Sequence, residues 1–584
     1  MRQNRINGWK YTSDLNTMLF FAQRLDELLF HHSIDSYRYP VLSLESLCSE
    51  YLRVYRDVKS ELINEANLKH IIEELTNSLK SDPVAINVLS KEYTERFISF
   101  YGAWSIKEQY DNVFYISRKL GNFTYYNGVI DLLKKNIKSN TGKRLVDKYA
   151  AVVVRLLIDY GYDENFIYKT LHNVFFWEPV ISFESLDNFF NTFDFKRKKY
   201  NVYIGFSKDV SKLFPLFQGM RVDKLTVSMI DVNHLPLGIK AKGQKTIIRF
   251  EGVESLDIYS AYTLVQTISD FIVNSYGFYS HMRNGVKRYG QVVDDKGNVT
   301  TINRSDLLKD RVSSSSHEES SRNANNLLKI TFSSYRNLEE ISKLTEIHNS
   351  AVYSNNTSDS LLSLWSILES QAEDDKEKDK ITCVKENVIP FLKSTYIEKL
   401  VSTVMADIRR WNRPFFEETI LNNNFGVSDL EHTFAFLTFD EFESDRKKLY
   451  SLTEEFPLLR NRVYILNAQL KNTKGYKSLI KEHVQRIGWQ LHRIYRARNY
   501  IIHDGTRNDD INRELVINLH SYVDTMFLKV FEMIGKSPYR DSIESIVISH
   551  KLSVLIMDEQ LKEQEKTNID RDNALKYLYY DFER

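Results

Sequence analysis

The amino-acid sequence predicts a mainly helical protein with a small α+β domain in its middle. Apolar residues recur at helical spacing along most of residues 1–195 and again within residues 328–584. Residues 196–310 instead contain short stretches in which apolar and polar side chains alternate, which is typical of strands. A run of four serines within residues 311–327 indicates a linker. We therefore expect an N-terminal helical region, a central α+β domain and a C-terminal helical bundle.

The clearest helix of the N-terminal region is expected over residues 144–160. Its buried face repeats at helical spacing and consists of Leu145, Tyr149, Val152 and Leu156. Gly161 ends this helix, and Asp163 and Glu164 suit the start of the next one. The many tyrosines and phenylalanines of the region are interpreted as core material, with stacking on nucleobases as the alternative.

The central domain is expected to be a sheet with a helix on one face. The β-rich stretches lie at residues 202–206, 225–229 and 246–250. A helix follows over residues 258–272, and Gly277 closes it. The sequence Asp-Lys-Gly-Asn at residues 295–298 predicts a hairpin turn.

Two basic patches belong to this central domain. The first is Lys196, Arg197, Lys198 and Lys199 between Phe195 and Tyr200, and the second is Arg283, Lys287 and Arg288. We interpret both as solvated entrances to strands, because charge runs usually have that role. The alternative is contact with nucleic acid, in which lysines bind phosphates and the neighbouring aromatic rings stack on bases.

Composition limits the function classes. The 79 basic and 78 acidic side chains leave a net charge of +1, so any site for a polyanion must be local. Two cysteines, Cys48 and Cys383, are too few for a thiolate zinc site or a disulfide framework, which favours a reducing cytoplasm. No stretch resembles a signal peptide or a membrane span. We expect a cytoplasmic protein that does not bind membranes.

The C-terminal region is expected to contain several long helices. One covers residues 338–353, and Ser358 or Asp359 caps the next, which includes residues 361–369. Residues 372–380 are expected to be a charged loop or a frayed helix end. Asp509 and Asp510 cap a helix with the buried face Leu515, Leu519, Tyr522, Met526, Val530 and Met533, and a helix over residues 541–561 braces the bundle.

The most concentrated chemistry lies at the end of a helix expected over residues 481–502. Its inward face reads Ile487, Leu491, Ile494, Arg498 and Ile501. A guanidinium group therefore interrupts an apolar face. Because it cannot be deprotonated and is costly to bury alone, Arg498 must face a carboxylate, a second protein surface or a phosphate. One alternative is a structural ion pair with an acid such as Glu369.

Asn499 and His503 are four residues apart, so the amide can orient the imidazole if the helix persists. Gly505 is then a natural stop for the helix. On composition alone, His503 would be interpreted as a helix C-cap that interacts favourably with the helix dipole.

Arg498, Asn499 and His503 match the R-polar-x3-H signature of the HEPN superfamily of helical nucleases and nucleotide-binding modules. The Leu-Trp-x-x-Leu-Glu pattern within residues 361–369 is similar to the helix that precedes this signature in the Apea-like branch, which is linked to phage defence. The resemblance covers roughly residues 330–540.

The resemblance implies metal-independent RNA cleavage by a homodimer in which two copies of the motif face one cleft. His503 would exchange protons with the ribose and the leaving oxygen, Arg498 would stabilise the phosphate, and Asn499 would orient the imidazole. Glu369 would be a positioning group rather than a catalyst. Arg493, Arg496 and Arg507 would extend the cleft into an RNA track, or would simply be solvated. Residues 1–310 would sense a phage-derived trigger or restrain the nuclease.

The rival interpretation is a non-catalytic HEPN module that binds nucleotides or proteins. Other enzyme classes find little support in the sequence. The fourteen histidines show no HExxH or comparable ligand spacing, so we expect no catalytic metal and no cofactor. Residues 141–144 are only a fragment of a phosphate-binding loop, and neither a nucleophile elbow nor a dinucleotide fingerprint occurs.

Overall fold

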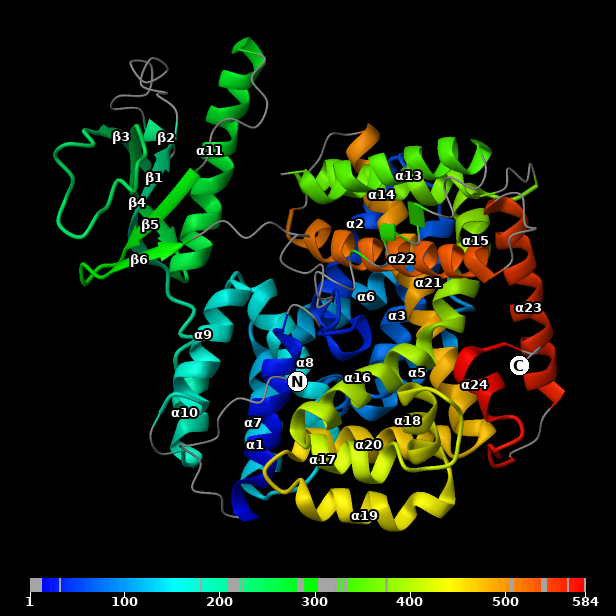
Figure 1. The fold of residues 1–584 in the computed structure, drawn as a ribbon. Coiled ribbons are helices and arrows are strands. Elements are labelled where there is room, and N and C mark those ends of the chain that lie inside the picture. The colour runs from blue at the N-terminus through cyan, green and yellow to red at the C-terminus, as the bar shows by residue number, and fades with distance from the viewer. Residues whose placement is uncertain are drawn as a thin grey trace. The chain divides into compact units, whose positions relative to one another are not determined.

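The computed structural model describes residues 13–30, 33–178, 181–207, 221–222, 225–280, 288–302, 321, 324–325, 327–328, 335–354, 356–372, 377–503, 509–536, 543–563 and 567–581. The chain forms two compact units (Figure 1). One comprises the described parts of residues 11–151 and 307–584, and the other comprises those of residues 152–306.

The first unit is built from helices. Its N-terminal part contains α1 (Asn16–Leu28), α2 (Leu44–Lys59), α3 (Ala66–Lys80), α4 (Pro83–Leu89), α5 (Lys91–Phe100), α6 (Ile106–Leu120), α7 (Thr124–Lys138) and the beginning of α8 (Lys143–Asp159). Caps set several of the helix starts. Ser105 and Glu108 form a capping box at α6, and Asp82 accepts from the backbone N–H of Ala85 at α4.

The C-terminal part of this unit supplies the remaining helices. They are α13 (Tyr335–Tyr353), α14 (Thr357–Ser370), α15 (Lys380–Ser394), α16 (Tyr396–Trp411), α17 (Arg413–Phe415), α18 (Asp429–Thr438), α19 (Glu443–Leu452), α20 (Pro457–Leu470), α21 (Thr473–His503), α22 (Asp509–Lys536), α23 (Ile543–Glu563) and α24 (Ala574–Tyr579). A large apolar core joins α16, α18, α20, the start of α21, the end of α23 and α24.

Buried ion pairs attach the N-terminal helices to the C-terminal ones. On α1, Glu27 accepts from Arg462 of α20 at 2.7 Å, and Arg24 donates to Asp147 of α8 at 2.6 Å. Arg462 also lies 3.4 Å from Asp147, which closes the network. Because α1 packs against both α7 and α20, all of its residues are buried.

This grouping differs from the domain division that the sequence predicts. The helices of residues 11–151 do not form a region apart from those of residues 328–584, and the second unit begins within α8 rather than at residue 196. The physical reason is that charged pairs such as Glu27 and Arg462 join segments more than 400 residues apart. Most of the predicted linker, residues 311–327, lies outside the described residues.

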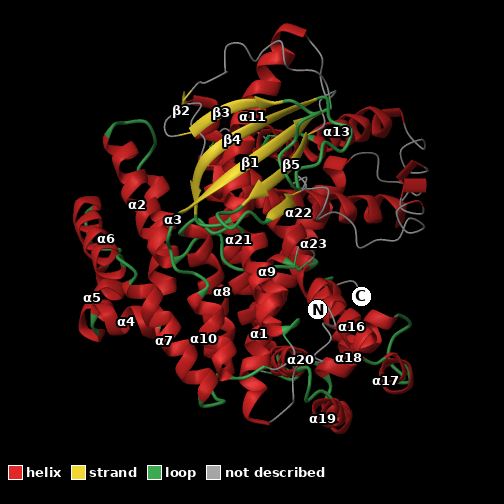
Figure 2. Ribbon diagram, turned by 90° about the vertical axis from the view of Figure 1, so that its left-hand side faces the viewer, coloured by secondary structure: helices red, strands yellow, loops and turns green. Residues whose placement is uncertain are grey.

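The second unit holds an antiparallel sheet. Its strands are β1 (Lys198–Phe206), β2 (Arg221–Val222), β3 (Leu225–Ile230), β4 (Thr246–Ser255), β5 (Arg288–Val293) and β6 (Val299–Ile302), in the order β2-β3-β4-β1-β5-β6. Val202, Ile204 and Phe206 face α11 (Ile258–Ser280) in the core. Figure 2 shows α11 crossing one face of the strands. The helices α9 (Glu164–Phe175) and α10 (Phe183–Asn191) complete this unit.

Several predicted elements are confirmed. The helix expected over residues 144–160 is α8, and Gly161 follows it with φ of +104°. The three predicted strands are β1, β3 and β4, and the predicted hairpin joins β5 to β6. Two predicted ends are wrong. The helix α11 continues past Gly277 to Ser280, and Asn356 rather than Ser358 or Asp359 caps α14, because its side chain accepts from the backbone N–H of Ser358.

Candidate functional site

Arg498 lies near the end of α21, which spans Thr473–His503 and includes the helix predicted over residues 481–502. Ile487, Leu491 and Ile494 are fully buried, as the predicted inward face requires. Arg498 continues that face one turn later, where the side chain becomes 26% exposed. The apolar face therefore ends at a partly solvated guanidinium group.

Two neighbours contact this guanidinium group. Nη2 of Arg498 forms an ion pair with Oε2 of Glu369 at 3.5 Å, and Nη1 donates to Oδ1 of Asn499 at 3.1 Å. The side chain of Glu369 is 20% exposed. Arg498 therefore faces Glu369, the acid predicted for a structural ion pair. A pair at this distance and exposure is weakly held, so the guanidinium group remains accessible to another anion.

Packing between α14 and α21 brings Glu369 to this position. Asn356 caps α14, and Trp365 is buried on the face of α14 that contacts α21. The ring of Trp365 lies 5.7 Å from that of Tyr495, measured between centroids. Glu369 follows Trp365 by four residues and therefore emerges on the same side of α14.

The opposite face of α21 is attached to the N-terminal helices. Arg493 donates to Glu50 of α2 at 2.8 Å and to Glu74 of α3 at 2.6 Å, and Arg496 donates to Glu50 at 3.0 Å. Further along the same face, Tyr500 donates to Asp57 of α2. This attachment was not predicted from the sequence. The available signal was the spacing of Arg493, Arg496 and Tyr500 along one face of a helix, but their acidic partners lie over 400 residues earlier in the chain.

Arg493 and Arg496 were predicted to extend an RNA track or to be solvated, and the structure places them elsewhere. Their side chains are 3% and 4% exposed, and both guanidinium groups are paired with Glu50. Burial opposes the charged form of Glu50, but the charges of Arg493 and Arg496 outweigh that effect and lower its pKa to about 2. These two arginines hold α21 against α2 and are not available to a substrate in this arrangement.

The Glu50 cluster predicts a loss of stability in acid. A group whose pKa is depressed by folding stabilises the folded state fully above its unfolded value, and that contribution disappears as the pH falls from about 4.5 to about 2. Burial raises the pKa of Glu74, so that carboxyl group acts in the opposite direction. Urea unfolding over this pH range measures the effect. Glu50→Gln should remove part of the slope, and an unchanged slope would contradict this assignment.

The remaining predicted site residues are described only in part. His503 is the last residue of α21, but its side chain lies outside the described residues, as do Gly505 and Arg507. The predicted contact of Asn499 with His503 therefore stays a prediction. Oδ1 of Asn499 accepts a hydrogen bond from Arg498.

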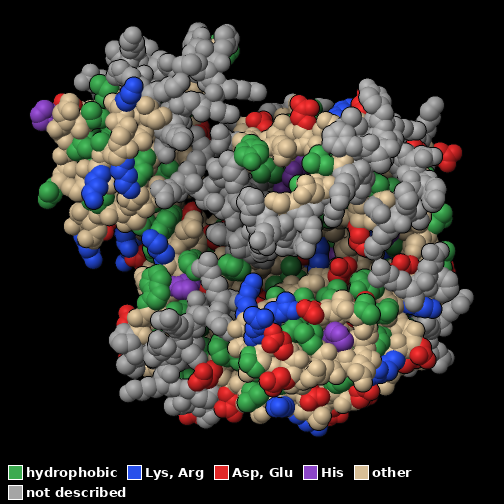
Figure 3. All heavy atoms as spheres, in the orientation of Figure 1, with side chains coloured by type: hydrophobic (Ala, Val, Ile, Leu, Met, Phe, Trp, Pro, Cys, Tyr) green, Lys and Arg blue, Asp and Glu red, His purple; other side chains and the backbone are tan. Residues whose placement is uncertain are grey.

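The first basic patch lies at the start of β1. Lys196, Arg197, Lys198 and Lys199 are exposed, and Figure 3 shows basic side chains along the edge of this unit. The flanking aromatic rings are not free to stack on bases, because Tyr200 is buried and Phe195 packs edge-on against Tyr160 and Tyr162. Of the second patch, Arg283 and Lys287 and the side chain of Arg288 lie outside the described residues.

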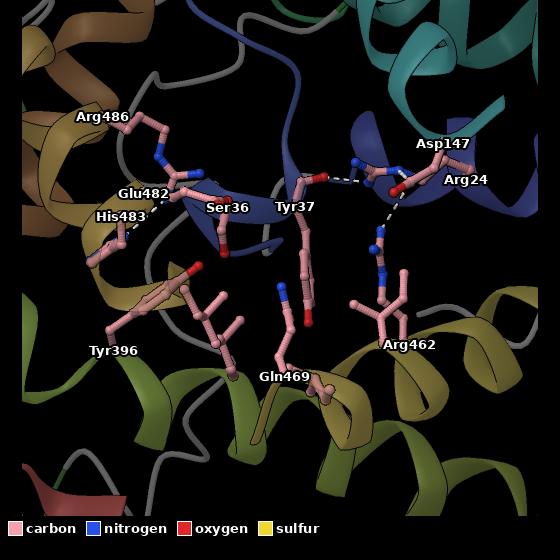
Figure 4. Close-up of a pocket in the computed structure, with 14 residues that line it drawn as sticks. Arg24, Ser36, Tyr37, Asp147, Tyr396, Arg462, Gln469, Glu482, His483 and Arg486 are labelled. Carbon is pink, nitrogen blue, oxygen red and sulfur yellow. Dashed lines mark hydrogen bonds and ion pairs between the residues drawn. The ribbon is translucent and has the colours of Figure 1, made fainter. Parts of the chain in front are cut away.

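A cavity of about 420 Å³ lies between helices from both ends of the first unit. In Figure 4, Arg24, Asp147 and Arg462 line one side, His483 and Arg486 line the other, and Tyr37 lies between them. The charged groups have partners: Arg24 pairs with Asp147 at 2.6 Å, and Arg486 pairs with Asp35 at 3.2 Å and donates to the imidazole of His483 at 3.0 Å. The lining thus serves the attachment of α1 to α8 and α20. Arg486 precedes Arg498 by twelve residues, or about 18 Å of helix.

A cluster of metal-ligating residue types is found elsewhere in the first unit. His348 of α13 and His520 and Asp524 of α22 present ligand atoms that all lie within 4.8 Å of one another. No sequence pattern indicates this cluster, because the two histidines are 172 residues apart and match no ligand spacing.

Comparison of the chain with protein-family models, curated proteins and solved structures finds no match. Among the described residues, none of the helices has both the length and the apolar composition needed to cross a membrane.

Proposed function

We propose that this protein is a metal-independent endoribonuclease of the HEPN type that acts in anti-phage defence by abortive infection. The observation that carries the proposal is the partly exposed guanidinium group of Arg498, which lies beside Glu369 and Asn499 near the end of the helix that also bears His503. Because this guanidinium group is weakly held and partly solvated, it can exchange its carboxylate neighbour for a phosphate.

The residues suit cleavage of RNA. Histidine has an unperturbed pKa of about 6.5, so His503 would take a proton from the ribose 2'-hydroxyl or give one to the leaving 5'-oxygen. Arg498 would stabilise the charge that develops on the phosphate. DNA lacks the 2'-hydroxyl, so this chemistry selects RNA. A second copy of the chain would complete the site by supplying the other acid or base.

The attachment of α21 to α2 and α3 supports a restraining or sensing role for the N-terminal helices. Arg493, Arg496 and Tyr500 fix α21 within two turns of Arg498. A trigger that moved α2 would act directly on the helix that carries the motif, and an RNase needs such control because it would otherwise harm its own cell.

The second candidate is a non-catalytic HEPN module that binds nucleotides or proteins. The ion pair between Arg498 and Glu369 favours it, since the same contact can serve only to hold α14 against α21.

One comparison separates the two. Purified wild type, His503→Ala and Arg498→Ala are incubated with total RNA in excess EDTA, alongside Arg413→Ala, which removes an exposed arginine paired with Glu417. The nuclease proposal expects cleavage by the wild type and by the Arg413 variant alone. Equal cleavage by all four proteins would reject this site, and binding of nucleotides without cleavage would favour the module. Mass measurement in solution tests the expected homodimer.

A further inference from the structure

His348, His520 and Asp524 form a compact cluster where α13 meets α22. Nε2 of His348 lies 2.9 Å from Oδ1 of Asp524, and Nδ1 of His520 lies 3.3 Å from Oδ2 of the same carboxylate. The two imidazole rings are 5.1 Å apart between centroids. We propose that these three residues bind a divalent transition-metal ion of the zinc type.

The distances approach the edges of a coordination tetrahedron. Zinc binds imidazole nitrogen and carboxylate oxygen at about 2.0–2.2 Å, so two ligand atoms of one tetrahedral ion lie about 3.3 Å apart. The nitrogen-to-oxygen distances are 2.9 Å to Oδ1 and 3.3 Å to Oδ2 of Asp524, at or below that value, and all three ligand atoms lie within 4.8 Å of one another. Small side-chain movements are enough to admit the ion.

The ligand set and its surroundings favour zinc-like ions over calcium or magnesium. Imidazole nitrogen is a ligand for zinc and its neighbours, whereas calcium and magnesium prefer sites made of oxygen atoms. His520 is buried, so its ring is fixed in position beside Asp524. His348 and Asp524 are partly exposed, which leaves a path for the ion. Three protein ligands leave a fourth position for water.

The buried ring of His520 gains little from its surroundings without an ion. Its Nε2 has no hydrogen-bond partner among the described residues, so its polar contact runs through Nδ1 and Asp524. A metal ion bound at Nδ1 would replace that contact, and Nε2 would then carry the hydrogen of the neutral ring. Lys399 opposes the ion, because its positive charge interacts with Asp524 and would repel a cation bound there.

The position of the cluster separates it from the proposed RNA site. Tyr522, between the two ligands of α22, donates to Gln490 of α21. Gln490 precedes Arg498 by eight residues, or about 12 Å along the helix. The ion would tie α13 to α22 away from the motif.

Titration of the full-length chain with cobalt(II), a spectroscopic substitute for zinc, tests the site. The expected result is one equivalent of cobalt with visible tetrahedral absorption, displaced by zinc. Asp524→Asn keeps the shape of the side chain but should weaken binding at least about tenfold. Asp231→Asn is the matched control, because Asp231 pairs with exposed His234 at 2.8 Å without a third ligand, and it should bind as the wild type does.

Three results would overturn the proposal: no tetrahedral spectrum in the wild type, equal affinity in Asp524→Asn, or equal losses in both variants. Melting temperatures without metal check that each variant is folded. The readout is binding, so it does not depend on the proposed nuclease. If a chelator lowers RNA cleavage by the wild type through this site, Asp524→Asn without chelator should cleave at the same lowered rate. If the chelator instead removes a metal from the scissile phosphate, cleavage by Asp524→Asn should still fall when the chelator is added.

Discussion

Replacement of Glu50 by alanine is expected to destabilise the protein by about 3–5 kcal/mol, because removal of one partner leaves buried charges uncompensated. Glu50 accepts from both Arg493 and Arg496, and all three side chains are buried. Neither guanidinium group can lose its charge to adapt. Glu74 would still pair with Arg493, but Arg496 would lose the carboxylate that it contacts.

Urea unfolding at neutral pH measures this effect. The matched control is Glu386→Ala, which removes a carboxylate paired with Lys378 at 2.8 Å on the surface. An exposed pair of this kind contributes about 0–1 kcal/mol, so the two variants should differ clearly. If Glu50→Ala unfolds at the same urea concentration as Glu386→Ala, the prediction is wrong. Water or another acid would then be compensating the charges of Arg493 and Arg496.

Replacement of Arg498 by alanine is expected to lower the rate of RNA cleavage about 10²–10³-fold, the usual effect of losing a group that stabilises transition-state charge. Arg498→Lys should also lose most of the activity, because an ammonium group cannot contact a phosphate through two parallel N–H bonds. Stability should change by less than about 1 kcal/mol, since the pair with Glu369 is long and partly exposed.

The structural alternative expects the reverse pattern. If Arg498 served only to hold α14 against α21, Arg498→Ala and Glu369→Gln would lower the melting temperature together and leave cleavage unchanged at temperatures where both are folded. Single-turnover rates and melting curves on the same samples distinguish the two outcomes. Arg413→Ala again serves as the surface control.

Local features of the fold could be predicted from the sequence because they depend on neighbouring residues. The apolar spacing of α8 and the glycine after it specify one helix and its end. Alternation along β1 and the turn between β5 and β6 specify strands and a hairpin. The inward face of α21, with Arg498 at its end, followed from the same periodicity.

Long-range pairing could not be predicted in this way. Nothing in the residues near Glu50 indicates that its partners are Arg493 and Arg496, because a helix with acidic residues is equally compatible with solvent. The same holds for His348 and His520, which come together only through the packing of α13 and α22. The apolar spacing predicts that Arg498 needs an anionic or protein partner, but it does not identify that partner. Glu369 is one of several alternatives in the sequence and is the partner in the structure.

The division of the chain has a consequence for its synthesis. The N-terminal segment of the helical unit ends at residue 151 and the rest begins at residue 307, so the first segment leaves the ribosome long before the second. Until then Glu50 lacks both of its arginines, and Glu27 has Arg24 but not Arg462. The N-terminal segment therefore stays incomplete while the sheet-bearing unit folds. The helix with the motif is therefore fixed in place late. A chain interrupted before residue 462 lacks Arg498 as well as the partner arginines Arg462, Arg493 and Arg496.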